Sequence, residues 1–454
     1  MKKFMSIVLV IAMAVTVLAG CQGQLSPKGL TDTKEVSTTA DGKVYFLNFK
    51  SELAKEWEEV ASDFTKETGI QMKVVTAGSG TYEQTLKSEV SKKNSPTIFN
   101  INGPVGYQTW KEYCADLKDT KIYEWLLDKS IAIEDGEGVY GIPYAVESYG
   151  IIYNNAIMKK YFALPDKAIE IQDTKEIKNF ETLKAVVEDM TAHKEALGIK
   201  GVFGSTSFAP GEDWRWQTHL ANIPVYYEYR DKGVSDLEQL DFTYAENFKN
   251  IFDLYLDNSC TDRKMVGSKN VEESMAEFAV GDVAMIQNGN WGWAMIYDLP
   301  GNIVKEEDIK FLPIYTGVKG EETQGLCTGT ENFICLNSKS PSEDQKASLE
   351  FLEWLFESET GKTNCINKLG MIAPFSTFDE TERPDNPLAK EMLAYMDDDN
   401  LTSVSWNFTT FPSQQFKNDF GASLLEYAQG NKKWNAVVED MKTSWAEEKA
   451  AAKE

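Results

Sequence analysis

The chain of 454 residues has little of several residue types that mark common classes of protein. It has only two histidines, His193 and His219, which lie too far apart in sequence to form a metal-ligand motif. Its cysteines include no Cys-x-x-Cys pair, so neither a zinc site nor a disulfide framework is indicated. No apolar run after residue 20 approaches the length of a membrane span. These absences argue against a metal site and against a chain that crosses the membrane after its first residues.

Basic residues are also fewer than acidic ones. The chain has 46 Lys and Arg against 71 Asp and Glu, which gives a formal net charge of −25. Such a surface repels phosphate backbones, so we expect no nucleic-acid partner. The charge does not identify the ligand.

The N-terminus predicts the compartment. Two lysines follow Met1, residues 4–17 are apolar, and Leu-Ala-Gly-Cys ends at Cys21. This pattern predicts a lipoprotein signal peptide over 1–20 and lipidation of Cys21. Residues 21–42 are then the lipidated cysteine and a flexible tether, because they are polar and rich in Gly, Ser and Thr. An ordinary signal peptide with a chance cysteine is the alternative.

The other five cysteines are an odd number, and we expect them to be buried thiols. A bridge between Cys327 and Cys335 is the alternative, although both lie in strand-like sequence.

The remaining residues, about 410 of them, are enough for two hydrophobic cores. Residues 44–49 predict a strand and residues 52–68 an amphipathic helix, and the alternation in 70–75 predicts a second strand. A strand–helix–strand unit of this kind implies a right-handed crossover and a parallel sheet. The fold class is therefore α/β.

Polar residues stand where predicted strands end. Asn48 and Lys50 follow the first strand, and Asn102 and Gly103 end the strand predicted over 96–103. Because ligands of open α/β sheets meet the carboxyl ends of the strands, these four are candidate ligand-binding residues. The alternative is that they are ordinary loop residues.

The run from Val139 to Asn155 is apolar and strand-like but contains the acid Glu147. A lone carboxylate in an apolar strand is unfavourable without a partner. Glu147 is therefore either a satisfied core acid or a carboxylate that faces a cleft and binds a polar ligand.

Aromatic and acidic residues stand together in the segment 210–216, which holds Asp213, Trp214 and Trp216. The CH face of a pyranose packs on a flat aromatic ring, and its hydroxyls bond to carboxylates. The segment therefore predicts sugar contacts, and the alternative is that both tryptophans belong to the core.

Three segments in order resemble the family 1 extracellular solute-binding proteins of ABC importers, the maltose-binding type. They are Val139–Asn155, with its Tyr-Gly-Ile-Pro-Tyr; Gly281–Trp291, with its Asn-Gly-Asn-Trp; and Gly325–Asn337. The resemblance covers roughly residues 43–450. It departs in the third segment, where Gly-Thr-Glu ending at Glu331 replaces the usual Gly-Gly.

The resemblance implies a two-lobed, periplasmic-binding-protein-like fold of type II. Each lobe would be a mostly parallel sheet flanked by helices, with hinge crossings at Val139–Asn155, Phe311–Ile314 and Lys368–Pro374. Lobe 1 would comprise 43–145 plus 313–369, and lobe 2 would comprise 146–312 plus 370–454.

The resemblance also implies further ligand contacts. Trp291 corresponds to an aromatic residue that stacks on the ligand, and Asn288 lies at the same strand end. Trp406 matches a region that holds a sugar-stacking aromatic. Glu331 is either a contact peculiar to this branch or a loop acid.

The function implied is a lipid-anchored, monomeric substrate-binding protein on the extracytoplasmic face of the bacterial membrane. It would bind a carbohydrate, an oligosaccharide in our interpretation, and deliver it to the permease subunits of an ABC importer. We expect no cofactor, no metal and no catalysis. The alternatives are a cell-surface glycoside hydrolase, which needs two suitably placed carboxyls, and a binding protein for a polyamine or peptide.

Overall fold

The computed structural model describes residues 42–78 and 80–452, within a unit that spans Thr39–Glu454. The predicted signal peptide, the lipidation site at Cys21 and nearly all of the tether lie outside the described residues. Within the described ranges, no helix combines the length and the apolar character needed to cross a bilayer.

The first sheet has six strands in the order β2-β1-β3-β11-β5-β4. Pairing of β1 with β2 and β3 is parallel, and the other three pairs are antiparallel. The strands are β1 Lys43–Asn48, β2 Gln71–Thr76, β3 Ile98–Ile101, β4 Ile133–Asp135, β5 Gly138–Pro143 and β11 Phe333–Leu336.

The opening strand–helix–strand unit is confirmed. Helix α1, Ala54–Thr68, buries Trp57, Val60, Ala61 and Phe64 on one face, because these apolar residues recur at helical spacing. Gly69 ends the helix with φ 78°, and its N–H donates to the carbonyl of Thr65 at 2.9 Å. This left-handed position favours glycine.

The second sheet has the order β12-β10-β6-β8-β7, and β9 also pairs with β6. Pairs β10–β12 and β7–β8 are parallel, whereas β6 pairs antiparallel with β8, β9 and β10. The strands are β6 Glu147–Asn154, β7 Gly201–Phe203, β8 Val283–Gly289, β9 Ile309–Leu312, β10 Gln324–Gly329 and β12 Thr402–Ser405.

The predicted α/β fold with two sheets is confirmed, but both sheets are mixed rather than mostly parallel. The reason is the crossings: β6 arrives from the first sheet and β11 returns to it, so each runs opposite to its neighbours. A period-2 pattern in the sequence carries no information on strand direction.

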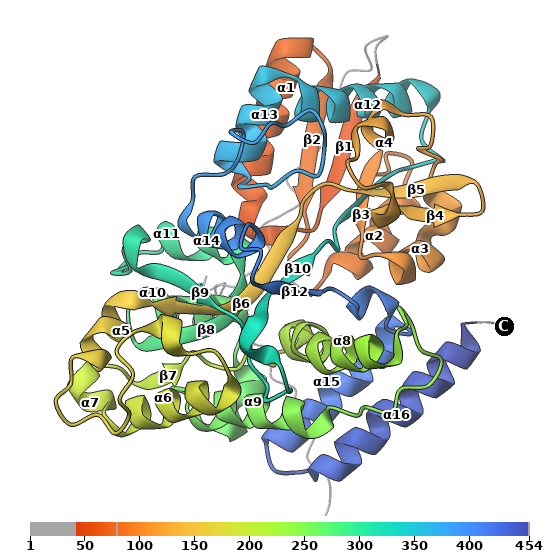
Figure 1. The fold of residues 1–454 in the computed structure, drawn as a ribbon. Helices are drawn as coiled ribbons and strands as arrows, with labels where there is room; N and C mark the ends of the chain where they lie inside the picture. Colours follow the sequence, from red (N-terminus) through yellow and green to blue (C-terminus); the bar gives the residue numbers. More distant parts are fainter. Residues whose placement is uncertain (1–41, 79, 453–454) are drawn as a thin grey trace, which may run out of the picture. The chain divides into compact units, whose positions relative to one another are not determined.

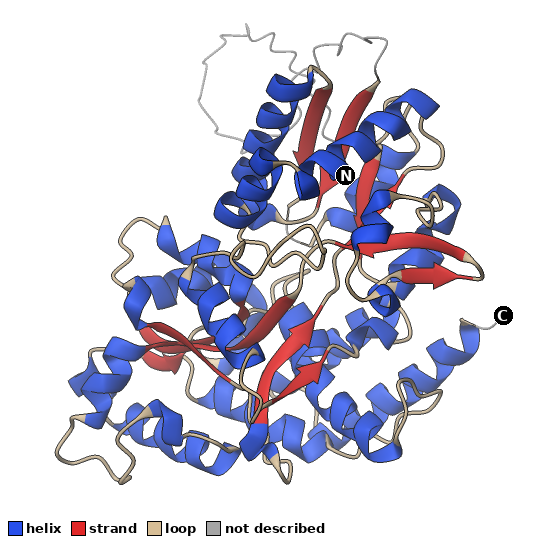
Figure 2. Ribbon diagram, turned by 45° about the horizontal axis from the view of Figure 1, so that its top comes forward, coloured by secondary structure: helices blue, strands red, loops and turns tan. Residues whose placement is uncertain are grey.

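Helices cover both faces of each sheet (Figures 1 and 2). On the first sheet, α1 and α12 pack on one face while α2 and α3 pack on the other. The helices around this sheet are α2 Tyr82–Val90, α3 Pro104–Trp110, α4 Lys121–Trp125, α12 Ser342–Glu357 and α13 Glu359–Thr363.

The second sheet lies between one large core and a smaller one. The smaller core takes residues from α10, α11, α14 and the short helix η7, Asn290–Trp293. The helices around this sheet are α5 Asn155–Phe162, α6 Phe180–Ala192, α7 Lys194–Leu197, α8 Ala221–Lys232, α9 Ala245–Asp257, α10 Val271–Ala279, α11 Ala294–Tyr297, α14 Pro387–Met396, α15 Gln414–Ala428 and α16 Trp434–Ala451. Below, the first and second lobes are the residues packed around the first and second sheets.

The first crossing between the lobes lies where the sequence predicts it. Strand β5 ends at Pro143 in the first sheet, and β6 begins at Glu147 in the second. Tyr144 and Ala145 belong to the core of the first lobe. The next residue, Val146, donates its N–H to the carbonyl of Ile372 at 2.8 Å.

The third crossing is not at Lys368–Pro374, and that prediction is wrong, because Phe375 packs in the core of the first lobe and pairs with Leu126. The chain enters the second lobe further along, between Phe378 and the start of α14 at Pro387.

The second crossing is not at Phe311–Ile314, and that prediction is wrong. Those residues end β9, which pairs with β6 in the second sheet, and Ile314 packs in the core of the second lobe. Strand β10 also pairs with β6. The chain returns to the first lobe at Thr330–Asn332, between β10 and β11. An apolar strand at a lobe boundary looks the same in sequence as one that stays in its own sheet.

The five cysteines of the described part carry free thiols. Four are buried and Cys260 is partly buried, so Cys327 and Cys335 do not form the alternative bridge.

Candidate ligand-binding site

A buried ion pair joins the end of the first strand to the first crossing. The ammonium of Lys50 donates to Glu147 Oε1, and Asn332 Nδ2 donates to Glu147 Oε2 at 2.9 Å. Lys50 and Glu147 are 6% and 7% exposed. Glu147 is thus held by partners from the first lobe and the second crossing.

The turn after β1 places Lys50. Asn48 is fully buried, its Oδ1 accepts from the N–H of Lys50 at 3.1 Å, and its Nδ2 donates to the Lys50 carbonyl at 3.0 Å. Asn48 therefore shapes the turn rather than facing the cleft. Its side chain is fully used by these bonds and by Thr76.

A second carboxylate, Glu52, lies 3.8 Å from the Lys50 ammonium. Burial disfavours the charged lysine, but the carboxylates of Glu147 and Glu52 outweigh it and raise the pKa of Lys50. Burial also raises the pKa of Glu52, although Lys50 opposes that shift. The three charged side chains of Lys50, Glu52 and Glu147 are therefore largely removed from water where the two lobes meet.

Three tryptophans from distant parts of the chain meet beside this pair. The ring centroids of Trp214 and Trp291 are 6.3 Å apart, and those of Trp291 and Trp406 are 6.4 Å apart. Trp406 is 8% exposed, while Trp214 and Trp291 are partly exposed. The Lys50 ammonium lies 5.5 Å from the Trp291 ring centroid, so the aromatic cluster and the ion pair adjoin.

His219 forms the floor of this tryptophan cluster. Its ring stacks on Tyr149 at 4.3 Å with an interplanar angle of 4°, and lies 5.7 Å from Trp291. Burial, followed by the positive charge of Arg215, lowers its pKa well below the ordinary value. The imidazole is therefore a neutral, flat packing surface at physiological pH.

Arg215 connects the cluster to nearby acids. Its guanidinium lies 3.8 Å from the Trp214 ring centroid, and its Nη1 is 3.7 Å from Glu212 Oε2. Burial lowers the pKa of Arg215 to about 9, with Glu212 and Glu52 opposing. Arg215 Nε and Nη1 and Glu212 Oε2 are buried without a hydrogen-bond partner. Such groups are unfavourable unless a ligand or water completes their bonding.

Three further charged groups, Asp213, Glu331 and Lys417, lie near the cluster. Burial raises the pKa of Asp213 to about 6, and burial raises the pKa of Glu331 as well. Lys417 on α15 is 2% exposed, and burial lowers its pKa although Glu331 and Glu83 oppose. In the described ranges, none of Asp213, Glu331 and Lys417 forms an ion pair within 4 Å.

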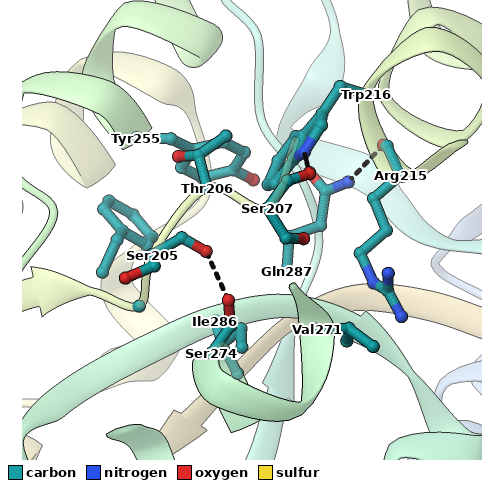
Figure 3. Close-up of a pocket in the computed structure, with 12 residues that line it drawn as sticks. Ser205, Thr206, Ser207, Arg215, Trp216, Tyr255, Val271, Ser274, Ile286 and Gln287 are labelled. Carbon is teal, nitrogen blue, oxygen red and sulfur yellow. Dashed lines mark hydrogen bonds between the residues drawn. The ribbon is translucent and has the colours of Figure 1, made fainter. Parts of the chain in front are cut away.

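Two cavities lie near these residues, and only one of them is large enough to hold a sugar. One, of about 10 Å³, lies under Ser205, Thr206 and Ser207 in the second lobe (Figure 3). There Gln287 Nε2 donates to the carbonyl of Arg215 at 2.9 Å. This space holds about one water and no sugar.

The other cavity, of about 440 Å³, is within the range of small-molecule sites. Lys50, Glu147, Asn290 and Trp291 line its buried end. Asn290 Oδ1 also accepts from the N–H of Ser148 at 2.9 Å, which fixes its side chain at the start of β6.

Several residues predicted to bind the ligand do not belong to the tryptophan cluster or to the ion pair beside it. Trp216 is 5% exposed in the core of the second lobe, and its Nε1 donates to the Ser207 carbonyl at 2.9 Å. Asn288 Nδ2 donates to the sulfur of Met275, so Asn288 points into the smaller core. Gly103 precedes α3 with φ 90° and lies against Thr409, and the side chain of Asn102 points back toward Gly106. Among the described residues, none of these four forms a ring contact or a side-chain hydrogen bond with Trp214, Trp291 or Trp406.

The lobes also approach each other away from the crossings. A Cβ built on Gly80 would lie 2.9 Å from the Cα of Gly211. Both glycines have positive φ, 69° and 82°, so a side chain is disfavoured by conformation as well as by space. The two loops meet in a closed arrangement of the lobes.

Sequence reasoning did not name Glu52, Arg215, His219, Asn332 or Lys417 as ligand contacts. Arg215 and His219 both follow Trp214 within the six-residue stretch Trp214–His219, and this proximity was the available signal. Nothing local marks Lys417, since it stands in an ordinary amphipathic helix. In the part of the chain described, no three His, Cys, Asp or Glu side chains gather as a metal site.

The Asp213 carboxyl gives a prediction for pH. Its folded pKa of about 6 is above the unfolded value of about 3.9, so the folded state binds the proton more tightly. Stability from this group is therefore gained as pH falls from about 6 to about 4. We expect Asp213→Asn to raise the free energy of unfolding at pH 7 by up to about 3 kcal/mol and to have little effect near pH 4.

Urea unfolding of both proteins between pH 4 and pH 7 measures this difference. Asp399→Asn, in an exposed turn, is the matched control and should change the free energy of unfolding by less than about 0.5 kcal/mol. A constant difference across the range for Asp213→Asn would contradict the assignment.

Comparison with known proteins gives one family and many similar structures. The family model of bacterial extracellular solute-binding proteins matches residues 59–391. No curated protein sequence matches the chain. A structure titled chitin oligosaccharide binding protein has a TM-score of 0.70 and 17% identity, covering 90% of this chain and 100% of that chain.

Two more solved structures are similar. The GacH receptor of Streptomyces glaucescens, determined unliganded and with acarbose, has a TM-score of 0.67 and 15% identity, covering 91% of this chain and 99% of that chain. A sugar transporter from Bacillus licheniformis in complex with stachyose has a TM-score of 0.63 and 18% identity, covering 89% and 100%. At these identities the likeness concerns the two-lobed fold.

Proposed function

Because the chain belongs to the bacterial extracellular solute-binding proteins, we propose that it captures a carbohydrate between its lobes for an ABC importer. The family places the protein on the extracytoplasmic side of the membrane and makes it a binding protein. The sugar, the delivery to permease subunits and the absence of catalysis are our inference.

The tryptophan cluster is the observation that carries the carbohydrate assignment. Trp214, Trp291 and Trp406 offer flat apolar rings, two of them partly exposed, directly beside the charged pair of Lys50 and Glu147. A sugar ring needs both features, since its CH faces pack on aromatic rings and its hydroxyls bond to charged groups. Three similar structures, described as binding chitin oligosaccharide, acarbose and stachyose, support the same class of ligand.

The proposed roles follow from the contacts. Trp291 stacks on the sugar, with Trp214 and Trp406 at its sides. On binding, Glu147 and Lys50 give up part of their contact with each other and form hydrogen bonds to sugar hydroxyls instead. These bonds are favourable because one partner in each is charged. Asp213, Glu331, Arg215 and Lys417 supply further polar contacts, and Asn48, Asn102, Gly103, Trp216 and Asn288 shape the surrounding loops and core.

Closure would occur by hinge motion at the crossings. We propose lobes close to those expected from the sequence, 43–145 plus 313–369 and 146–312 plus 370–454. Two changes are needed. The segment up to Gly329 belongs with the second lobe, because β10 pairs with β6. The segment up to Phe378 belongs with the first lobe, because Phe375 packs in the first core and pairs with Leu126. The three crossings then lie at 144–146, at 330–332 and between 378 and 387.

The anchor and the assembly state are part of the same proposal. Lipid on Cys21 and a tether over 22–42 would hold a monomer at the outer face of the membrane.

The test uses residues 22–454 and a panel of mono- and oligosaccharides, spermidine and a peptide mixture. Binding of each compound is detected as a shift in thermal unfolding. A ligand that binds only the folded state adds about 2.7 kcal/mol of stability at a hundredfold excess over Kd. A shift confined to one sugar class, with the sugar recovered intact, supports the proposal. Cleavage of the sugar would favour a glycoside hydrolase, and a shift with spermidine or peptide alone would reject the carbohydrate assignment.

A further inference from the structure

Of the residues assigned above, Lys50, Glu147 and Trp291 line the 440 Å³ cavity, and the cavity extends beyond them. Its buried end holds Trp291 and Glu147, but its lining also includes Trp293 and Tyr297, which come from the next turn of the second lobe. The short helix η7, Asn290–Trp293, runs directly into α11, Ala294–Tyr297. One continuous segment thus lines the cavity from its buried end to its exposed end.

The exposed end carries an aromatic platform. The rings of Trp293 and Tyr297 stack with centroids 5.7 Å apart and an interplanar angle of 21°. Tyr297 is 47% exposed, and Trp293 is partly exposed at the edge of the smaller core of the second lobe. Two stacked rings open to a cavity are not explained by core packing alone, because the outer ring stays largely in water.

Polar groups of the first lobe and of the third crossing line the same cavity. They are Glu56 and Glu59 on α1, Asn367 and Lys368 of the first lobe, and Asn386 at the end of the third crossing. In the described residues, the side chain of Glu56 forms no ion pair and the side chain of Asn367 forms no hydrogen bond. Burial, Asp298 and then the carboxylates of Glu56 and Glu59 raise the pKa of Tyr297, as expected for acids that face its hydroxyl.

We propose that Trp293 and Tyr297 form an outer subsite that stacks a further pyranose ring of an oligosaccharide whose inner ring lies on Trp291. The inference rests on the proposed function. Hydroxyls of the outer ring would bond to Glu56, Lys368 and Asn386 across the cavity. The ligand is therefore an oligosaccharide that leaves the cleft between α1 and α11, and a monosaccharide fills only the buried end.

The experiment is a calorimetric length series on the wild-type protein and on Trp293→Ala/Tyr297→Ala. The probes are maltose to maltotetraose, chitobiose to chitotetraose, and sucrose, raffinose and stachyose. In the series that binds, we expect wild-type affinity to rise at least tenfold as rings are added. The double variant should lose this gain and bind the shortest member within twofold of wild type.

Two controls keep folding separate from binding. Tyr297→Ala alone removes only the exposed ring and should lose part of the gain with an unchanged melting temperature. Tyr113→Ala, a partly exposed aromatic of the first lobe that packs edge-on against Trp110, should keep the full gain.

The outcomes separate the two proposals. Wild-type affinity that does not grow with length, or growth that survives in the double variant, would overturn the outer subsite and leave the carbohydrate assignment standing. Failure of the wild-type protein to bind any sugar would overturn both.

Discussion

Trp291→Ala is expected to weaken sugar binding by about 30- to 1000-fold while the protein remains folded. Trp291 is the central ring of the cluster, within 6.4 Å of the ring centroids of both Trp214 and Trp406, and it lies next to the Lys50 ammonium. Truncating an aromatic residue that is central to a binding site costs about 2–4 kcal/mol, which corresponds to that range of affinity. Because Trp291 is partly exposed, its loss should affect the free energy of unfolding less than the loss of a core tryptophan would.

Isothermal titration with the sugar found in the panel measures this effect. Trp291→Phe retains a flat ring and should recover part of the affinity. Trp354→Ala removes a partly buried tryptophan of the first lobe, far from the cluster in the fold, and should leave affinity unchanged. An affinity of Trp291→Ala within threefold of wild type would remove the basis of the carbohydrate assignment.

Local sequence signals predicted the parts of the fold that depend on local physics. The spacing of Trp57, Val60 and Phe64 predicted α1, and Gly69 predicted its end. The same kind of signal failed at Phe311–Ile314, where an apolar strand was assigned to a crossing that lies further along, at Thr330–Asn332. Strand pairing is decided by partners more than 150 residues away, which the local pattern does not contain.

In the candidate site too, local sequence patterns predicted some residues and missed others. Trp214 and Trp216 are equally aromatic and two residues apart, but the first faces the cluster and the second faces the core. The segment Arg215–Leu220 is a π-helix, so neither strand nor α-helix periodicity assigns its faces. Lys417 and Glu52 were missed because their importance comes only from burial beside opposite charges of other elements.

Glu147 was recognisable in sequence as an acid in need of a partner, but that partner, Lys50, was identified only as a strand-end residue. The structure joins them, and this pair gives the prediction with the largest effect on stability. We expect Lys50→Met to lower the free energy of unfolding by about 3–5 kcal/mol, because it leaves Glu147 buried with only Asn332 as a hydrogen-bond donor.

The loss should be measured by urea unfolding near pH 7. The folded pKa of Lys50 is raised, so its contribution is fully present below the unfolded value of about 10.4 and is lost only as pH rises through the folded pKa. Lys55→Met is the matched control. Lys55 lies 3.9 Å from Glu59, and its side chain is 79% exposed, so its removal should change stability by less than about 1 kcal/mol.

The double variant Lys50→Met/Glu147→Leu distinguishes a buried charge pair from simple packing. Removing both charges removes the penalty of an unpaired carboxylate, so the double variant should be more stable than Lys50→Met, even though one more native side chain is lost. If the two substitutions were additive, the pair would not be coupled in solution. The double variant should nevertheless bind sugar poorly, because the charged groups proposed to meet the hydroxyls are gone. Stability restored without binding would therefore separate the structural role of the pair from its role toward the ligand.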